Sequence, residues 1–228
     1  MKYILRIALP KGRLFEETLE FFKSKGILEE TFEEGRKLQV RVSDYEFLLV
    51  KPFDVPVYVE NGVADLGVVG YDVLLEREPE VYELYDLGIG FCRLVIAGKE
   101  EMLEQYKKAS FLRVATKYPK ITREFFLEKG IKTKVIHLHG SVELAPLLNL
   151  SDVIMDLVQT GRTLKENNLV VFEEITPSTA RLICNRASYR NKKDEIFSFL
   201  SKVQRERPKE AIQPHPRATY PSLLPSFQ

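Results

Sequence analysis

Apolar stretches alternate with segments of helical pattern along the chain. Residues 3–9 form a short apolar run interrupted only by Arg6, which predicts a first strand. In residues 14–26 the apolar side chains recur near helical spacing, and Gly26 supplies a glycine stop. The chain therefore begins with a strand followed by an amphipathic helix.

The same alternation continues to about residue 168. Further strands are predicted at 38–42, 46–50, 64–70, 111–119, 132–140 and 152–158, and helices at 54–62, 121–130, 141–150 and 163–168. Asp54 and Ser141 are expected to cap two of these helices, because both are good N-cap residues. Alternating strands and helices indicate an α/β fold with mostly parallel sheets.

Two long apolar runs, at residues 90–98 and 180–188, flank the second block of elements. Such paired runs are typical of connections between two lobes, with a ligand cleft at the junction. The predicted lobes are residues 1–92 plus 182–204, which form a discontinuous first lobe, and residues 93–181, followed at 205–228 by an extended tail. The tail contains five prolines and no periodic pattern, which predicts an extended segment, either a native tail or an addition foreign to the protein.

Composition excludes several classes of protein. The 44% hydrophobic and 29% charged residues are typical of a globular protein, and 34 basic against 33 acidic side chains leave a net charge of +1. No global field therefore draws the chain to nucleic acid, and no run approaches the roughly 20 apolar residues that span a bilayer. The N-terminal residues lack a signal-peptide pattern. Cys92 and Cys184 lie in apolar runs without zinc or disulfide spacing, so we expect buried, reduced thiols in a cytoplasmic protein.

The most informative stretch, residues 152–168, predicts a phosphate site. Asp156 stands near the end of a buried strand, and a turn from Thr160 through Gly161 to Thr163 leads into a helix. The glycine lets the backbone approach an anion, while free helix amides and two hydroxyls supply donors. A carboxylate for the ribose diol followed by such a turn suits a ribose 5-phosphate. An ordinary strand-to-helix turn has the same pattern.

Other strand-to-helix junctions also carry polar residues. Lys11 and Arg13 bracket Gly12 at the carboxyl edge of the first strand, where paired cations suit a pyrophosphate or triphosphate. A solvated loop would explain them equally well. Asp72 follows a glycine-flanked strand, and Glu143 stands at the start of a helix, where capping alone would explain it.

Familiar metal and nucleotide motifs are missing from the sequence. His137 and His139 lie two apart on a predicted strand and so face one side, but they lack the further ligands of a zinc site. His215 lies in the tail. Neither a G-x-x-x-x-G-K-[ST] nor a G-x-G-x-x-G motif occurs, so an ATP site here would be neither a P-loop nor a Rossmann site.

Five segments together resemble one family. They are ALPKGRL (8–14), DVPVYVENGVADLGVVGYDVL (54–74), RVATKYP (113–119), HGSVELAPLLNLSDVIMDLVQTGRTL (139–164) and ARLICNRAS (180–188). In this order they resemble the ATP phosphoribosyltransferase family over nearly the whole chain to about residue 203. Several long motifs in sequence are far more specific than a single Thr-Gly turn.

The resemblance implies a two-lobed core like that of type II periplasmic binding proteins, with the active site between the lobes and Mg²⁺ as cofactor. It implies that the loop from Asp156 to Thr163 holds the ribose and 5-phosphate of phosphoribosyl pyrophosphate (PRPP). It also implies that the region of Lys11 and Arg13 binds nucleotide and pyrophosphate. The expected site residues are Lys11, Gly12, Arg13, Lys51, Asp72, Glu143, Asp156, Gln159, Thr160, Gly161, Arg162 and Thr163, with Asp156, Lys11 and Arg13 as catalytic residues.

Three residues depart from the pattern expected of this family. Lys51 stands where arginine is frequent, Gln159 where glutamate is frequent, and Arg162 where asparagine is usual. Lysine keeps the charge at position 51 but loses the planar fork that contacts phosphate with two bonds. Gln159 leaves Asp156 as the main acid for ribose or Mg²⁺.

The implied reaction joins N1 of ATP to C1 of PRPP with release of pyrophosphate, the first step of histidine biosynthesis. The chain resembles the short form, a catalytic subunit that works with a regulatory protein related to histidyl-tRNA synthetase in a hetero-oligomer and is dimeric when isolated. Two alternatives stay open. A sensing protein of the same fold would bind a small anion without releasing pyrophosphate, and another phosphoribosyltransferase would use PRPP but be indifferent to ATP.

Overall fold

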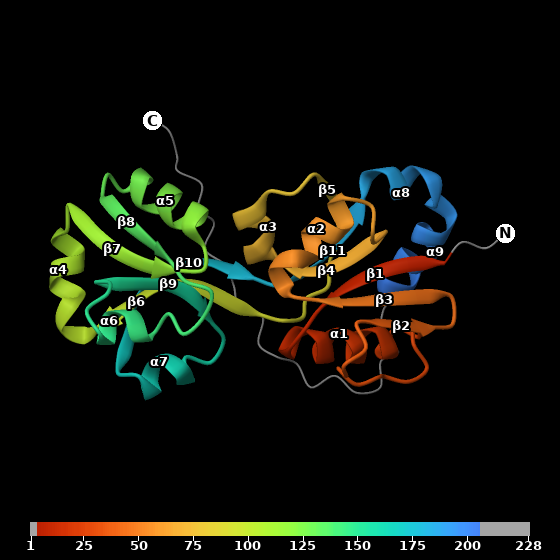
Figure 1. The fold of residues 1–228 in the computed structure, drawn as a ribbon, viewed down its shortest axis with the longest axis horizontal. Coiled ribbons are helices and arrows are strands. Elements are labelled where there is room, and N and C mark those ends of the chain that lie inside the picture. Colours follow the sequence, from red (N-terminus) through yellow and green to blue (C-terminus); the bar gives the residue numbers. More distant parts are fainter. Residues whose placement is uncertain (1–3, 206–228) are drawn as a thin grey trace.

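The computed structural model describes residues 4–205 and has two lobes lying side by side (Figure 1). Each lobe is one sheet with helices packed on both faces. The predicted two-lobed α/β fold is thus confirmed. Residues 206–228 of the predicted tail, with His215, lie outside the described residues.

The first lobe holds a six-stranded sheet in the order β2-β3-β1-β4-β11-β5. Its strands are β1 (Leu5–Pro10), β2 (Gln39–Val42), β3 (Tyr45–Val50), β4 (Leu66–Gly70), β5 (Val81–Asp86) and β11 (Ala180–Asn185). β1 runs parallel to β3 and β4, whereas β2, β11 and β5 join through antiparallel pairs. Pro10 pairs with Val50, so the segments after β1 and β3 leave the sheet side by side.

The second lobe holds a five-stranded sheet in the order β10-β6-β9-β7-β8. Its strands are β6 (Cys92–Lys99), β7 (Phe111–Thr116), β8 (Lys132–His137), β9 (Val153–Val158) and β10 (Leu169–Ser178). β7 is parallel to β8 and β9, and β6 is antiparallel to β9 and β10. Both sheets are therefore mixed rather than mostly parallel, because the strands at the two lobe crossings run against their neighbours.

Nine helices and two short 3₁₀ turns are present in the described range 4–205. They are α1 (Arg13–Ser24), α2 (Val55–Glu60), α3 (Tyr71–Arg77), α4 (Leu103–Lys108), α5 (Pro119–Glu128), α6 (Leu144–Leu147), α7 (Arg162–Glu166), α8 (Arg186–Asn191) and α9 (Lys193–Val203), with the 3₁₀ turns at Pro52–Asp54 and Glu100–Met102. Gly26 ends α1 with a φ of 65°, and its amide bonds to the Lys23 carbonyl, which confirms the predicted glycine stop. None of these helices is long and apolar enough to cross a membrane.

The two predicted side-chain caps are wrong. No side-chain hydrogen bond caps α2 or α6. Asp54 has helical backbone angles because a turn beginning at Pro52 already leads into α2, whereas a capping residue needs extended angles. Ser141 has a φ of 49° and stands before Glu143, the residue that directly precedes the short α6.

Alternation of side chains buries both faces of each sheet. In β1, Ile7 and Leu9 belong to the core cluster under α1 and α9, and Ala8 between them belongs to the cluster under α2. In β6, Ile96 lies on the face of α4 and α5, and Val95 on the face of α6 and α7. Strands buried on both faces account for the near-continuous apolar runs of the sequence.

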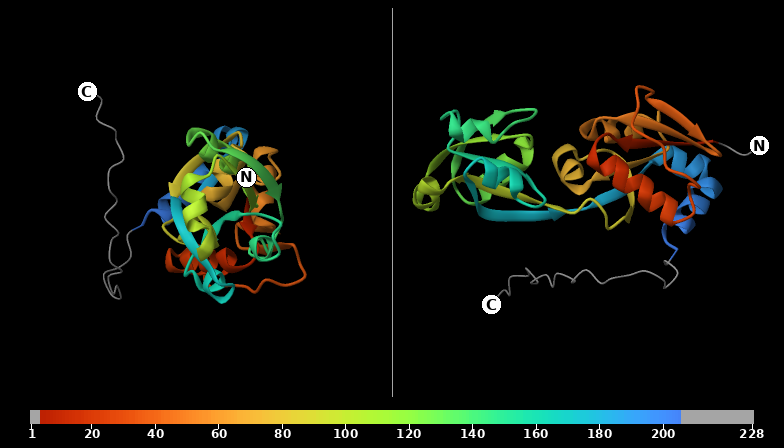
Figure 2. Two further views of the ribbon diagram at one scale, coloured as in Figure 1. Left: turned by 90° about the vertical axis from the view of Figure 1, so that its left-hand side faces the viewer. Right: turned by 90° about the horizontal axis from the view of Figure 1, so that it is seen from below.

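The chain crosses between the lobes twice, from β5 to β6 and from β10 to β11 (Figure 2). β6 begins at Cys92 and β11 at Ala180, close to the predicted lobe limits at 92/93 and 181/182. The lobes as separate domains stay a prediction. Cys92 and Cys184 are buried free thiols as predicted, and burial raises their pKa to about 11 and about 12.

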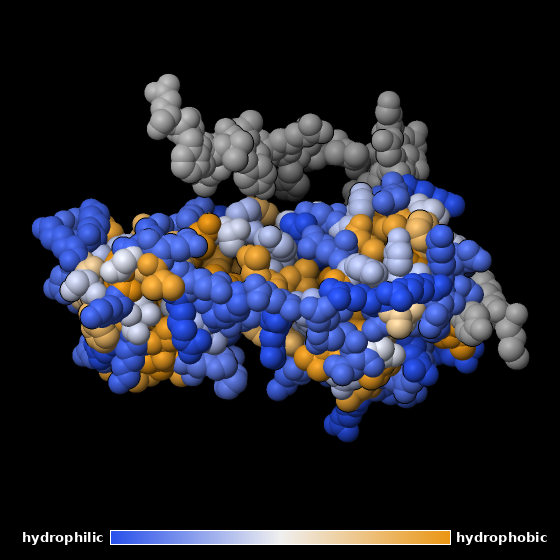
Figure 3. All heavy atoms as spheres, turned by 90° about the horizontal axis from the view of Figure 1, so that it is seen from above, coloured by the Kyte–Doolittle hydropathy of each residue, from blue (hydrophilic) through white to orange (hydrophobic). Residues whose placement is uncertain are grey.

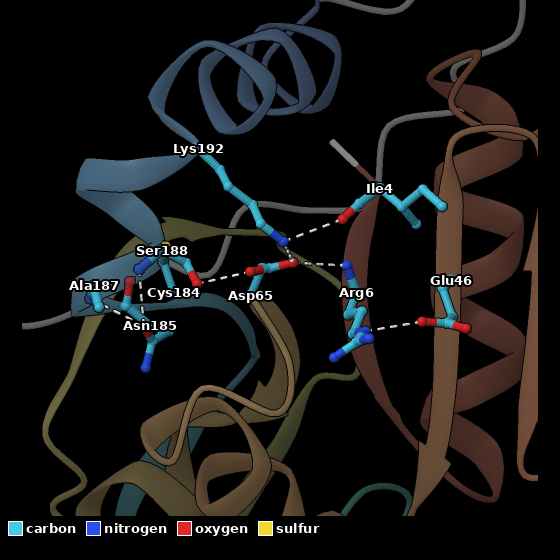
Figure 4. Close-up of polar contacts among 9 residues, drawn as sticks. All are labelled: Ile4, Arg6, Glu46, Asp65, Cys184, Asn185, Ala187, Ser188 and Lys192. Carbon is cyan, nitrogen blue, oxygen red and sulfur yellow. Dashed lines mark hydrogen bonds and ion pairs between the residues drawn. The ribbon is translucent and has the colours of Figure 1, made fainter. Parts of the chain in front are cut away.

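Asp65 fastens the C-terminal helices to the first lobe (Figure 4). Its buried carboxylate accepts hydrogen bonds from the Arg6 amide at 2.9 Å, the Ser188 hydroxyl at 2.7 Å and the Lys192 ammonium at 2.7 Å. Asn185 caps α8 by accepting from two of its amides at 2.9 Å. These bonds lie near the amino end of β1, away from the lobe junction, so their role is to hold the fold.

Candidate active site between the lobes

A pocket of about 280 Å³ lies where the two lobes meet. It is lined by Arg13, Cys92, Glu143, Asp156, Leu157, Val158, Gln159, Thr160, Gly161, Arg162, Thr163 and Leu164. Arg13 comes from the start of α1 in the first lobe, and the others come from strands, loops and the start of helix α7 in the second. The structure thus brings together the predicted loop from Asp156 to Thr163 and one of the two predicted cations.

Asp156 is a buried acid near the end of β9, with 8% of its surface exposed. Its carboxylate accepts the Leu157 amide at 2.9 Å, and the Lys117 ammonium lies 3.9 Å away. Burial raises the pKa of Asp156 to about 6, with further raising by the charges of Glu143 and Asp72, while Lys117 and the Leu157 amide oppose the shift. The carboxylate is therefore poorly solvated and has spare acceptor capacity for ligand hydroxyls.

The turn after β9 presents backbone amides and hydroxyls to the pocket. Gly161 directly precedes α7 with a φ of 77° and a ψ of 3°, the left-handed conformation that glycine adopts without strain. Thr160 and Thr163 are exposed at the pocket wall. The Arg162 guanidinium bonds at 2.7 Å to Glu166 one turn further along the helix, and the arginine side chain is largely exposed. The backbone amides and the two hydroxyls are thus better suited to bind an anion here than Arg162, whose guanidinium already bonds to Glu166.

The turn after β1, like the turn after β9, joins a strand to a helix through a glycine, but its amide and its arginine bond to acidic side chains of the protein. Gly12 precedes α1 with a φ of 86° and a ψ of −154°, a region open essentially to glycine alone. Its amide donates to the Glu34 carboxylate at 2.7 Å. The Arg13 guanidinium bonds to Glu17, whose other oxygen accepts the Gly90 amide of the first crossing segment at 2.8 Å. Acidic side chains of the protein therefore hold this turn and its arginine.

Two further cations stand at the same edge of the first lobe. The Lys11 amide donates to the Val50 carbonyl at 2.8 Å, and Lys51 directly follows Val50. The parallel register of β1 and β3 thus sets Lys11 beside Lys51 at the carboxyl edge of the sheet. Neither lysine lines the pocket. Their roles in binding stay predictions, as do those of the other site residues.

Asp72 is a predicted site residue that the structure keeps out of the pocket. It is 4% exposed at the start of α3, and both carboxylate oxygens accept hydrogen bonds. Tyr118 donates to one oxygen at 2.8 Å and Ser178 to the other at 2.7 Å. Both oxygens of the Asp72 carboxylate are therefore occupied by hydrogen bonds within the protein, and this geometry disfavours direct contact with a nucleotide.

Glu143 is a second carboxylate at the pocket wall beside Asp156. It is half-buried and its charge raises the Asp156 pKa. A pair of carboxylates lining a pocket suits Mg²⁺, which proteins usually bind through one or two carboxylates together with substrate phosphates. Within residues 4–205 no group of three metal-ligating side chains is preformed, so phosphate oxygens would complete such a site. The ring centroids of His137 and His139 lie 4.8 Å apart at the end of β8, with the ring planes tilted by 54°.

Lys117 is a pocket neighbour that sequence reasoning missed. It follows β7, which lies beside β9 in parallel, so its ammonium reaches the Asp156 carboxylate. The motif RVATKYP contains it, yet a lysine after a strand is common in any surface loop. The signal that could have found it is its place at the carboxyl edge of the strand beside the one bearing Asp156, which requires the strand order.

The fold and the pocket define a class of protein: a two-lobed α/β protein with a candidate anion site at the lobe junction, built from a buried acid, a Thr-Gly-X-Thr turn and a facing arginine. Comparisons with known proteins narrow this class. The sequence model of the ATP phosphoribosyltransferase family matches residues 51–205. A protein named ATP phosphoribosyltransferase from Aquifex aeolicus is 58% identical over 200 residues, covering 88% of this chain and 94% of the relative. One from Hydrogenobaculum is 52% identical, covering 88% and 98%.

Solved structures agree with these relatives. The ATP phosphoribosyl transferase (HisG:HisZ) complex from Thermotoga maritima contains a chain of 39% identity with a TM-score of 0.74, covering 88% of this chain and 96% of that one. The periplasmic VFT2 domain of Bordetella pertussis BvgS has a TM-score of 0.58 at 12% identity, covering 87% and 86%, and shows likeness of fold alone. The chain belongs to the ATP phosphoribosyltransferase family. Members of this family require a divalent metal ion.

Proposed function

We propose that this chain transfers the phosphoribosyl group of PRPP to N1 of ATP, giving N1-(5-phosphoribosyl)-ATP and pyrophosphate, the first step of histidine biosynthesis. The observation that carries the proposal is the pocket itself: Asp156 and the turn from Thr160 to Thr163 form one wall, and Arg13 faces them from the other lobe. The carboxylate suits a ribose diol, the turn suits a 5-phosphate, and the arginine suits a departing pyrophosphate.

The reaction is a displacement at C1 of the ribose. The N1 lone pair of adenine forms the new bond to C1 as the bond from C1 to the pyrophosphate oxygen breaks, and pyrophosphate leaves with that electron pair. Because positive charge develops on the ribose ring, the ionised Asp156 carboxylate stabilises the transition state as well as holding the ring hydroxyls. Arg13 in the pocket, and Lys11 at the same edge of the first lobe, neutralise the negative charge of the leaving group, and the pocket holds N1 in line with C1.

Mg²⁺ is the proposed divalent ion. Asp156 and Glu143 would hold it together with phosphate oxygens of PRPP. Bound there, the ion supplies charge neutralisation for the leaving pyrophosphate. The residues of the chain then orient the ribose and exclude water from C1.

The proposed setting is a cytoplasmic hetero-oligomer. The related Thermotoga maritima chain was solved in a HisG:HisZ complex, and we propose a corresponding regulatory subunit, related to histidyl-tRNA synthetase, as partner of this chain. We further propose that the isolated chain is a dimer and that residues 1–92 plus 182–204 and residues 93–181 act as two domains around the pocket.

Pyrophosphate release tests the proposal. Purified chain, alone and mixed with the regulatory subunit, is incubated with PRPP and Mg²⁺ with ATP present or omitted. We expect release only when ATP is present. Release with another base but not ATP would move the chain to a different phosphoribosyltransferase reaction. No release in any mixture, together with no thermal stabilisation by PRPP, would leave a binding protein of the same fold as the better reading.

A further inference from the structure

A buried hydrogen bond joins the two lobes beside the pocket. Tyr118, in the segment between β7 and α5 of the second lobe, donates its hydroxyl to Asp72 at the start of α3 in the first lobe, with an oxygen-to-oxygen distance of 2.8 Å. Tyr118 is 2% exposed and Asp72 is 4% exposed. A hydrogen bond to a carboxylate in such a dry site is strong, and leaving one partner without it is costly.

The same carboxylate is tied to the point where the chain crosses back to the first lobe. Ser178, the last residue of β10, donates to the other Asp72 oxygen at 2.7 Å, and its hydroxyl accepts the Asp72 amide at 3.1 Å. The Cys92 thiol, at the start of β6, lies 3.8 Å from the Ser178 carbonyl. The Tyr118 hydroxyl is therefore connected to both crossings through Asp72 and Ser178.

Packing around Tyr118 also joins the lobes. Its ring lies 5.6 Å from that of Phe53, and Phe53 and Leu75 of the first lobe pack against the core cluster of the second. The Glu76 carboxylate of α3 accepts the Lys120 and Ile121 amides at the start of α5, at 2.9 and 3.0 Å. On the side where α3 and α5 lie, hydrophobic residues gather near the middle of the molecule (Figure 3). Buried apolar contacts and hydrogen bonds thus join the lobes along this side.

The backbone of Tyr118 is held as firmly as its side chain, and it carries Lys117 with it. The Tyr118 amide donates to the Thr116 hydroxyl at 2.8 Å, and its carbonyl accepts from the Thr122 hydroxyl at 2.6 Å. Lys117 stands between these anchored residues, with its ammonium 3.9 Å from the Asp156 carboxylate. The position of Tyr118 against Asp72 therefore sets the position of Lys117 against Asp156.

We propose that Tyr118 is a positioning residue for the transfer: its hydroxyl, held by Asp72 across the lobes, fixes Lys117 beside the Asp156 carboxylate in the place that the reaction requires. This inference rests on the proposed function and deepens it. Asp72 then acts through Tyr118 and not by touching a nucleotide. Burial and the charge of Asp72 hold the Tyr118 pKa well above its ordinary value, so the hydroxyl stays a donor at neutral pH.

The test compares two buried tyrosines that make the same bond in different places. Tyr118→Phe removes the bond between lobes and keeps the ring. Tyr106→Phe is the matched control, because Tyr106 donates to the Glu173 carboxylate at 2.7 Å and belongs to the same core cluster, yet both partners lie in the second lobe. The kcat, the KM for PRPP and the melting temperature are measured for both variants, with the regulatory subunit and Mg²⁺ present.

We expect Tyr118→Phe to lower kcat by about tenfold or more, the worth of one hydrogen bond to a buried charge. The KM for PRPP should stay within about twofold, because the loop that holds the phosphoribosyl group lies within one lobe. Tyr106→Phe should lower the melting temperature to a similar extent and leave kcat within about twofold of wild type.

A double-mutant cycle distinguishes positioning from folding. In a Lys117→Met background, which removes the charge and keeps the stem, Tyr118→Phe should add less than about twofold, because its effect runs through Lys117. Equal kcat losses in both tyrosine variants, or full additivity with Lys117→Met, would overturn the inference while leaving the proposed function intact. A wild-type complex without ATP-dependent turnover would overturn both.

Discussion

Strand β9 carries one acid just before its start and another near its end, and the two carboxylates have opposite surroundings. Asp152 accepts the Arg113 amide at 2.7 Å and its guanidinium at 2.6 Å, on the amino side of the strand. Although burial opposes it, the bonds and charge of Arg113 hold the Asp152 pKa below its ordinary value. Within residues 4–205, Asp156, four residues on, has only the Leu157 amide at bonding distance and Lys117 at 3.9 Å, and its pKa is raised to about 6.

The hydrogen bonds and pKa shifts of the two carboxylates indicate that Asp152 stabilises the fold and that Asp156 is a candidate for binding a ligand. Both carboxylate oxygens of Asp152 accept hydrogen bonds from Arg113, so the charge of Asp152 stabilises the fold. Asp156 is buried with its acceptor capacity incompletely used, so its charge costs stability until a ligand supplies donors.

Asp156→Ala should reduce turnover by about a thousandfold, because it removes the group that holds the ribose and stabilises its developing charge. Asp152→Ala should change turnover by less than about fivefold. Pyrophosphate release gives both values, and circular dichroism verifies that each variant is folded. An Asp156→Ala enzyme that keeps most of its activity would remove this residue from the mechanism.

Asp156→Asn should stabilise the ligand-free protein at neutral pH. A folded pKa near 6 against an ordinary value of 3.8 means that protonation favours the folded state, so stability is greatest below pH 3.8 and is lost as the pH rises through about 6. The wild type thus loses up to about 3 kcal/mol at pH 7 that asparagine does not lose. Melting temperatures of both proteins from pH 4 to 8 should diverge as the pH rises.

Asp152→Asn is the opposite control, because its native pKa is lowered. Its charge contributes stability above the unfolded pKa, and that stability is lost as the pH falls through the lower folded pKa. We expect this variant to lose about 1.5 kcal/mol or more at pH 7, the worth of hydrogen bonds to a charged group. If both variants shifted the melting temperature in the same direction at pH 7, the contrast between the two acids would fail.

The pH dependence of the reaction should follow Asp156. The ionised carboxylate is the form that accepts ribose hydroxyls and stabilises a cationic ring. The value of kcat/KM for PRPP should therefore fall about tenfold per pH unit below about pH 6 and level off above it. A profile that stays flat from pH 5 to 7, at constant saturation with ATP and Mg²⁺, would contradict an acid of raised pKa in the free enzyme.

Lys117→Met should shift the pH dependence of kcat/KM for PRPP, and this is the smallest of the expected effects. Because the Lys117 charge opposes the rise in the Asp156 pKa, its removal should move the acidic limb to higher pH. Arg113→Met, which removes the partner of Asp152, should leave the limb where it is. The comparison of the two limbs needs only kcat/KM at several pH values for each variant.

Much of the fold was readable from local pattern. The strand and helix alternation, the stop at Gly26 and the turn at Gly161 each depend on residues close in sequence, and each was located. Strands β5 and β10 were not located, because their exposed and buried residues follow no simple alternation, and helices α3 and α4 were not located either. The apolar runs of β6 and β11 were interpreted as connections between the lobes, whereas the structure shows them as strands inside the two sheets. The sheets were expected to be mostly parallel, and they are mixed. The local pattern could not show this, because the direction of a returning strand depends on contacts with residues far along the chain.

In the candidate site, too, residues close in sequence could be predicted, whereas residues brought together by the fold could not. The loop from Asp156 to Thr163 is contiguous, so its pattern alone indicated a phosphate site. Lys117 and Tyr118 act on residues 39 and 46 positions away in sequence, and only the strand order and the lobe packing bring them there. Asp72 was expected near a nucleotide, yet its bonds to Tyr118 and Ser178 became visible only in three dimensions.

In the proposed mechanism the second lobe binds the phosphoribosyl group and the first lobe binds the departing pyrophosphate. Calorimetric titration of ribose 5-phosphate and of Mg²⁺-pyrophosphate against wild type, Thr163→Val and Arg13→Gln tests it directly. We expect Thr163→Val to weaken ribose 5-phosphate by about tenfold and pyrophosphate little, and Arg13→Gln to do the reverse. If one variant weakened both ligands equally and the other weakened neither, the two lobes would not divide the substrate in this way.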